Sequence, residues 1–215
     1  LHLGQSNRFN LDKMIAGGQK TPGQILFNTN LNNPSLYMRG SDGAGRVSAI
    51  RLGDESDSGA TSGPSTGTMN LLAGTSDLLV DTIILGKSQN ANGSSAATGN
   101  LLMGSGTLNV NTLALGSQAN SSYGGTVTGN ATFSNTVVTV NTSLQMGVSA
   151  GSTSPRVANL NIFGGSMTVN GIYKNQGTVN MNVTNATLTM PTGSSITANN
   201  IQLDGGTIAN AGTLK

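Results

Sequence analysis

The chain has 215 residues and a formal net charge of +2 at pH 7, and Gly, Asn, Thr and Ser together make up half of it. Charged residues are only 8% and aromatic residues only 3%, so the basic stripe with interleaved aromatics that nucleic-acid binders use is absent. Cysteine is also absent, which excludes a disulfide framework, a thiolate zinc site and a cysteine nucleophile.

The first predicted element is the segment 9–17, Phe-Asn-Leu-Asp-Lys-Met-Ile-Ala-Gly, whose apolar bursts end on a glycine. Alternating apolar residues of this kind indicate β-strands with one buried face. Residues 18–66 follow this pattern least well, because they contain three of the five prolines and the long polar stretch 53–67. We expect irregular larger loops in 18–66, within a single domain that spans 1–215.

A repeat becomes clear in the middle of the chain. The motif Leu-Leu-Val-Asp-Thr-Ile-Ile-Leu-Gly at 78–86 returns at 108–116 and 138–147, and more loosely at 167–173. Its Asx residue recurs at intervals of 30, 30 and 29, as Asp81, Asn111, Asn141 and Asn170. We also predict a further copy at 196–203. A second element, beginning Thr-Gly, keeps the same step at 66–71, 98–103 and 128–133.

A unit of about 30 residues with two or three short strands cannot bury its apolar face alone. Stacking the units at the strand spacing of about 4.8 Å closes a continuous core. The sequence therefore predicts an all-β fold, a single-stranded right-handed parallel β-helix or solenoid with about 30 residues per coil. The side chains that we expect to face inward are Val80, Ile83, Val110, Leu113, Leu115, Val140 and Leu144.

The regularly spaced Asx residues predict a ladder of side chains. Stacked coils place them directly above one another, so that their amides can hydrogen-bond from coil to coil. We expect each to occupy a sharp turn, since Asn and Asp tolerate the left-handed region better than other non-glycine residues. Asn111 should then lie between Asp81 and Asn141, with a structural role and no catalytic one.

Several segments resemble bacterial surface β-solenoids of the autotransporter-passenger type. These are the Thr-Leu-x-Leu-Gly endings, the strand Gly-Thr-Leu-Asn-Val-Asn at 106–111 and the stretch Arg-Gly-Ser-Asp-Gly-Ala-Gly-Arg-Val at 39–47. The resemblance covers most of the chain and specifies fold more than activity. It implies a secreted bacterial protein, extracellular or at the cell surface, that serves as a stalk, an adhesin body or a filament subunit.

An enzyme is the class of function to weigh against this. The β-helix fold also carries polysaccharide lyases and hydrolases, which need clustered carboxylates. This chain has eight carboxylates, and after Asp81 only Asp204 remains. We therefore expect no catalytic and no cofactor-binding residues. The alternative left open is a carbohydrate-binding or polysaccharide-degrading β-helix, in which carboxylates and aromatics would meet in one groove.

One acidic cluster has the composition of a calcium loop. Asp54, Glu55 and Asp57 offer hard oxygen ligands just before a glycine. The bidentate Glu that a calcium loop carries six residues beyond the glycine is replaced by Ser65. We favour a solvated loop here, and these three residues remain the candidate calcium ligands.

Neither end of the chain reads as a capping unit. The segment 1–4, Leu-His-Leu-Gly, matches the close of an internal coil, and 206–215 reads as strand, turn, strand. Uncapped solenoid ends expose strand edges and open core. We expect head-to-tail self-association or continuation into further coils, with carbohydrate or cell-surface contact as further partners. No nucleic-acid partner is expected, because the basic stripe with interleaved aromatics is absent. No membrane span is expected either, because no apolar run approaches the roughly 18 residues that a span requires.

Overall fold

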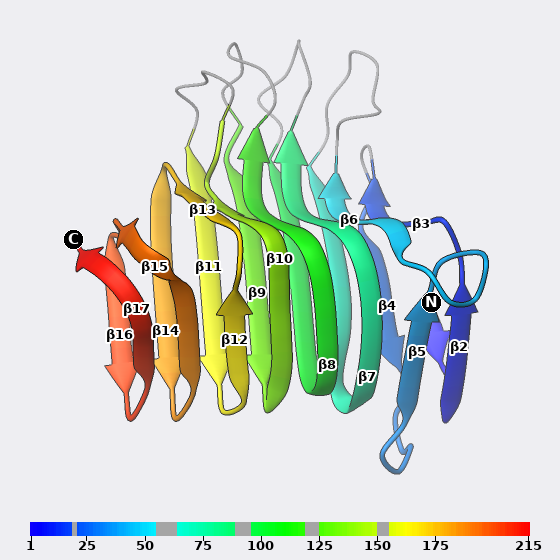
Figure 1. Ribbon diagram of the computed structural model, residues 1–215. Helices are drawn as coiled ribbons and strands as arrows, with labels where there is room; N and C mark the ends of the chain where they lie inside the picture. Colours follow the sequence, from blue (N-terminus) through cyan, green and yellow to red (C-terminus); the bar gives the residue numbers. More distant parts are fainter. Residues whose placement is uncertain (19–20, 55–63, 89–95, 119–124, 150–154) are drawn as a thin grey trace.

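The computed structural model describes residues 1–18, 21–54, 64–88, 96–118, 125–149 and 155–215. The regular structure of these residues consists of seventeen β-strands, which pair in parallel with one another (Figure 1). Nine strands form an all-parallel sheet that curves through 290° and nearly closes on itself. The all-β fold with parallel pairing is therefore confirmed.

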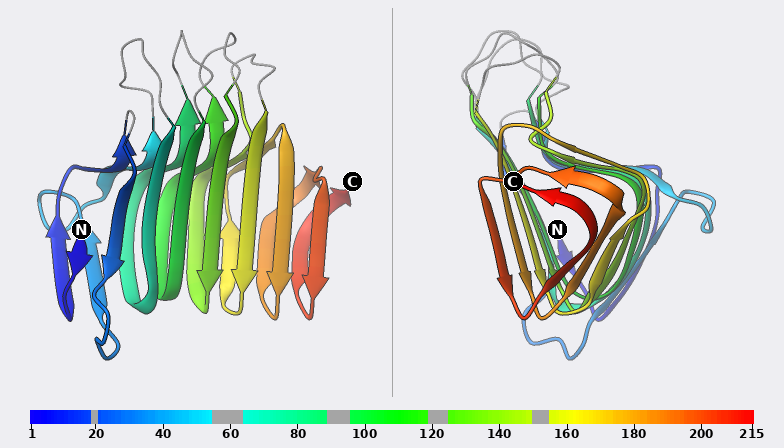
Figure 2. Two further views of the ribbon diagram at one scale, coloured as in Figure 1. Left: turned by 180° about the vertical axis from the view of Figure 1, so that it is seen from behind. Right: turned by 60° about the vertical axis from the view of Figure 1, so that its left-hand side comes forward.

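The strands follow one another along the molecule in chain order (Figure 1). Those of the N-terminal part are β1 (His2–Leu3), β2 (Ser6–Asn10), β3 (Lys13–Gly18), β4 (Gly23–Phe27), β5 (Ser35–Arg39) and β6 (Val47–Asp54). The middle contains β7 (Ser65–Ser88), β8 (Ala97–Gln118), β9 (Val127–Ser134) and β10 (Thr136–Met146). The C-terminal part contains β11 (Arg156–Phe163), β12 (Ser166–Val169), β13 (Ile172–Asn175), β14 (Thr178–Thr184), β15 (Thr187–Ile196), β16 (Asn200–Asp204) and β17 (Thr207–Leu214). Seen nearly end-on, successive strands overlie one another around a common outline (Figure 2).

The register of the pairing follows the predicted repeat. Leu78 pairs with Leu108, Leu108 with Val138 and Val138 with Met167, so partners stand 30, 30 and 29 residues apart. The Thr-Gly element pairs in the same way, Thr66 with Thr98 and Thr98 with Thr128. Both predicted repeats are therefore confirmed as strand partners.

The N-terminal copy at 9–17 is also confirmed. Phe9 pairs with Met38, and Met38 pairs with Leu78 of the middle repeat. The intermediate partner lies inside 18–66, where the strands β4, β5 and β6 alternate with the stretches 28–34 and 40–46. In β6, Ile50 pairs with Ile83, so this strand is a copy of the motif that the sequence pattern did not reveal.

The copy predicted at 196–203 is wrong. Ile196 ends β15 and pairs with Leu214 of β17, whereas β16 pairs with β14. The reason is that the repeat shortens: Ala158 pairs with Val179, 21 residues away, and Met181 with Ile201, 20 residues away. Only residues 176–177 join β13 to β14, whereas residues 119–126 join β8 to β9. The shorter connection brings paired residues closer together in the sequence.

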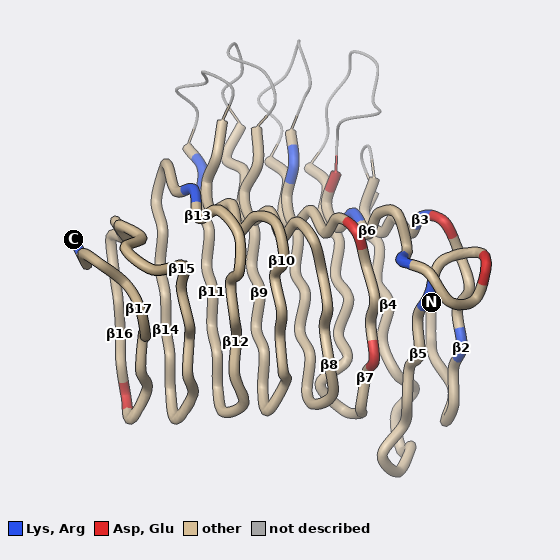
Figure 3. The backbone as a smooth tube through the Cα atoms, in the orientation of Figure 1, with Lys and Arg blue, Asp and Glu red and all other residues tan. Residues whose placement is uncertain are grey.

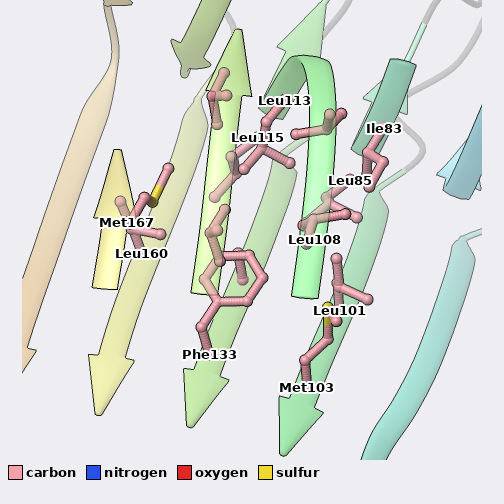
Figure 4. Packing of buried hydrophobic residues seen from close by; sticks show 14 of the residues in the cluster. Ile83, Leu85, Leu101, Met103, Leu108, Leu113, Leu115, Phe133, Leu160 and Met167 are labelled. Atoms are coloured by element: carbon pink, nitrogen blue, oxygen red, sulfur yellow. The ribbon is translucent and has the colours of Figure 1, made fainter. Parts of the chain in front are cut away.

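The apolar core lies inside the curved sheet and runs without interruption from Leu3 to Ile196. In Figure 4 the side chains of β8, β9 and their neighbours, among them Leu113 and Phe133, point to one interior. All seven side chains predicted to face inward are buried, as expected. Their alternation with outward polar residues is the period-two pattern of a strand with one buried face.

Glycine, and not the Asx residue, occupies the left-handed turn of each repeat. Gly86 closes the motif with φ of +66°, and Gly116 and Gly147 repeat this with +64° and +66°. A Cβ on Gly86 would lie 2.1 Å from the backbone oxygen of Thr128, so only glycine fits. The predicted left-handed conformation of the Asx residues is wrong, because Asp81, Asn111, Asn141 and Asn170 have negative φ.

Candidate binding face

The predicted Asx ladder is present. The Asn111 Nδ2 donates a hydrogen bond to Asp81 Oδ1 at 2.6 Å, and Asn141 Nδ2 donates to Asn111 Oδ1 at 3.1 Å. The predicted ladder ends there: within the described residues the Asn170 side chain makes no hydrogen bond to it, and the Asn170 backbone N–H donates to the Val140 oxygen at 2.9 Å. Asn111 thus lies between Asp81 and Asn141, and the ladder ties β7, β8 and β10 together.

A second and longer amide ladder was not foreseen. It runs over the outward face of β7, β8, β9, β11 and β14, where each Asn Nδ2 donates to a side-chain oxygen on the preceding strand. Its four bonds are Asn100 to Thr68 (3.1 Å), Asn130 to Asn100 (2.7 Å), Asn159 to Asn130 (2.6 Å) and Asn180 to Asn159 (2.7 Å). The Thr-Gly-Asn of 98–100 and 128–130 is the signal of this ladder in the sequence.

A polar hollow of about 320 Å³ opens beside the second ladder, over β9, β11, β14 and β16. Seven of the eight side chains that line it are amides, namely Asn130, Asn159, Asn161, Asn180, Asn182, Asn200 and Gln202. The amides of this hollow that lie outside the ladder make few side-chain hydrogen bonds. Asn161 donates to Thr132 Oγ1 at 3.4 Å, and Asn182 accepts from Thr184 Oγ1 at 3.0 Å. Asn200 and Gln202 make no side-chain hydrogen bond to any residue that the structure describes.

A second hollow of about 320 Å³ lies over β5, β7, β8 and β10, and its charges are already paired. Arg39 Nη2 is 2.6 Å from Asp77 Oδ2, and the Arg39 guanidinium stands 3.9 Å from the centre of the Tyr37 ring. Arg46 reaches across two strands, donating to the Val80 oxygen at 2.9 Å and to Asn109 Oδ1 at 2.6 Å. These arginines clamp neighbouring strands to one another, because each meets several acceptors at once.

The candidate calcium ligands are placed only in part. Asp54 is buried at the end of β6, with its Oδ2 3.3 Å from Arg51 Nη1. Glu55 and Asp57 lie outside the described residues. Among the residues that the structure describes, no three metal-ligating side chains gather. The calcium site stays a prediction.

Two further ionisable groups serve the local structure. Asp42 closes the 40–46 stretch, where its Oδ1 accepts from the N–H groups of Ala44 and Gly45 at 3.0 and 2.7 Å. These bonds to the charged form lower the pKa of Asp42 below its ordinary value of 3.8. Burial raises the pKa of the Tyr173 hydroxyl, because the interior disfavours the phenolate.

The chain matches no protein-family model, no curated protein and no solved structure. Across the described part of the chain, no helix is long and apolar enough to cross a membrane.

Proposed function

We propose that the chain is one right-handed parallel β-helix and serves as an extracellular structural or adhesive segment of a bacterial surface protein. The observation that carries this is the series of parallel pairings that links the described strands from β1 to β17, with local register shifts in three of the pairs. In the middle of the chain, β8 pairs with β7 one repeat before it and with β9 and β10 one repeat after it, which is how stacked coils pair. Right-handed winding is the rule for such parallel crossovers.

The chemistry of the described side chains supports a scaffold. The two amide ladders and the two arginine clamps spend their hydrogen-bonding groups on neighbouring coils. The two hollows of about 320 Å³ hold either amides or charges that are already paired. The hollow of amides contains no carboxylate, which disfavours hydrolysis there. The motifs shared with autotransporter-type passengers support the extracellular location.

The two ends of the β-helix favour contact with more coils. Among the strands that the structure describes, β2 and β3 at one end pair only with β5 and β6, and β16 and β17 at the other pair only with β14 and β15. Each end therefore has a row of unpaired backbone groups on one edge. Apolar side chains accompany these edges, with Ile15 44% exposed at one end and Leu203 and Leu214 47% and 48% exposed at the other. Head-to-tail stacking, or continuation into further coils, would cover both.

Sedimentation velocity and electron microscopy at increasing protein concentration test the stacking. We expect linear particles that lengthen with concentration, because a head-to-tail contact does not close. A double variant, Leu203→Lys with Leu214→Lys, places charge at one end and should suppress the longer particles. The control Val137→Lys, on a side chain 51% exposed along the flank, should leave them unchanged.

A stable monomer at every concentration would remove self-stacking and leave only covalent continuation into further coils. Compact particles that grow in all directions would contradict the scaffold itself.

A further inference from the structure

The amide side chains of the hollow form two columns, and those of one column make more hydrogen bonds within the protein than those of the other. The inner column is the second ladder, in which Asn159 and Asn180 are bonded to their neighbours at 2.6 and 2.7 Å. The outer column is Asn161, Asn182 and Gln202, which stand two residues further along the same strands. The inner bonds hold the inner column in place, whereas most donors and acceptors of the outer column point to solvent.

The spacing of this surface is regular in two directions. Asn161 pairs with Asn182, and Asn182 with Gln202, so the amides of one column repeat at the strand spacing of about 4.8 Å. The two columns are two residues apart on each strand, roughly 7 Å. A ligand lying along the molecule meets a pair of amides on each of β11, β14 and β16, and Asn130 with Thr132 on β9.

The surface is uncharged where it is hollow. On β11 and β16 the charged residues are Arg156, at the start of one strand, and Asp204, at the end of the other. Figure 3 shows the strands between them without charged residues along their middle. An amide offers one acceptor and two donors, and it therefore suits hydroxyl groups, which both donate and accept. An anionic ligand would meet no cation there.

An aromatic ring stands at the edge of the same face. Phe163 follows Asn161 by two residues on β11, so both point to the same side of the sheet. Phe163 is 37% exposed, whereas Ile162, the residue before it on the strand, points to the core and is fully buried. An exposed ring beside polar groups is the arrangement that packs against the apolar face of a sugar ring.

From these features we propose that the outward face of β9, β11, β14 and β16 binds a neutral, hydroxyl-rich linear polysaccharide lying along the stack of strands. The amide columns bind its hydroxyls and Phe163 contacts a sugar ring. Each sugar makes few contacts, so affinity grows with the number of sugars that bind in succession. The proposal goes beyond the scaffold role and does not depend on head-to-tail stacking.

The test uses the full chain with a panel of neutral and anionic glycans, measured by isothermal titration calorimetry and by pull-down on insoluble material. The neutral probes are cello-, malto-, xylo- and manno-oligosaccharides and their polymers, and the anionic ones are polygalacturonate and heparin. We expect at least one neutral series to bind, with affinity rising with length, and neither anionic polymer to bind.

Variants locate the site. Replacing the outer column (Asn161→Ala, Asn182→Ala, Gln202→Ala) should lower the association constant about tenfold or more, since each lost hydrogen bond weakens binding. Phe163→Ala should lower it by a smaller factor. The matched control replaces three outward threonines on the neighbouring flank, Thr139→Ala, Thr168→Ala and Thr189→Ala, and should bind as the unchanged chain does. Circular dichroism and thermal unfolding establish that all variants are folded.

Three results would overturn the proposal. One is that no neutral glycan binds, and another is that the outer-column and control variants bind equally. The third is that the outer-column variant loses self-association and not glycan binding, which would assign this face to a second copy of the chain.

Discussion

Within the repeated motif, glycine and the Asx residue have separate tasks. Elsewhere asparagine does adopt the left-handed conformation, at Asn30, Asn33, Asn135, Asn185 and Asn210. The left-handed turn that closes the motif belongs to Gly86, Gly116 and Gly147, whereas Asp81, Asn111 and Asn141 sit on ordinary strand backbone and bond through their side chains. Stacking explains the division. At the glycine a neighbouring strand's backbone comes too close for any Cβ, and at the Asx position there is room for a side chain to reach the next strand.

Alanine substitutions at two glycines with positive φ distinguish the loss of stability caused by close packing from the loss caused by backbone conformation. Gly86→Ala combines a φ of +66° with a backbone oxygen 2.1 Å from the new Cβ. Gly193→Ala has a φ of +78° but no atom within 4 Å of the Cβ. We expect Gly193→Ala to lower the free energy of unfolding by about 1 kcal/mol. Gly86→Ala should lower it by about 3 kcal/mol or more, or prevent folding. Urea unfolding of both variants is the measurement, and equal losses would contradict the close packing.

The predicted ladder should contribute modestly to stability. Asn111→Leu removes the bonds to Asp81 and Asn141, but all three side chains are in part accessible, so water replaces some of what is lost. We expect the free energy of unfolding to fall by about 1 kcal/mol. The comparison is Asn170→Leu, whose side chain makes no ladder bond within the described residues and should cost clearly less. Equal unfolding midpoints for the two variants would remove the ladder from the stabilising interactions.

At the scale of the strand, the alternation of inward and outward residues decides what a substitution costs. Phe133 on β9 is fully buried, and Phe163 on β11 is 37% exposed. We expect Phe133→Ala to lower the free energy of unfolding by about 3–5 kcal/mol, because it leaves a cavity in a continuous core. Phe163→Ala should change it by about 0.5 kcal/mol at most. Chemical denaturation tests the pair, and a small loss for Phe133→Ala would mean that the core collapses around the cavity.

The sequence predicted those elements whose apolar alternation is uninterrupted. The motif at 78–86 and its copies at 108–116 and 138–147 could be aligned because at most one extra residue, in 138–147, separates their two apolar bursts. The copy in β6 was missed because 40–46 separates Met38 from the strand that holds Ile50. The last repeats were misaligned because a spacing of 30 was carried on where pairing shortens to 20.

The candidate binding face could not be predicted from the sequence for a related reason. The Asn residues of β11 and β14 are common residue types in ordinary strand positions, and only the pairing of Asn159 with Asn180 places them in one column. Because the repeats differ in length, no fixed period aligns Asn130 with both Asn159 and Asn180. The hollow then depends on three-dimensional register, which local alternation does not contain.

For the molecule as a whole, in the proposed β-helix, strand pairing joins each coil to its two neighbours, and few contacts, such as that of Arg46 with Asn109, reach further. Interior coils such as that of β8 pair on both sides, and the coils at the two ends pair on one. Stability in such a stack is the sum of coil and interface contributions, so it is lowest where one interface is missing. Hydrogen exchange should therefore be slowest in β7, β8 and β10 and fastest in β2, β16 and β17. Uniform protection along the chain would show instead that the stack opens as one unit.

The strands' orientation across the long axis determines how the molecule would respond to a pulling force. Tension along that axis loads the hydrogen bonds between neighbouring strands one after another, as in unzipping, and does not shear a whole row at once. With no cysteine in the chain, no disulfide limits how far it can extend. In the proposed β-helix, each coil of about 20 to 30 residues that detaches would release roughly 70 to 100 Å of extended chain. If the chain serves as the stalk that we propose, it would lengthen stepwise under load, absorbing work at each step while the coils still in place keep their shape.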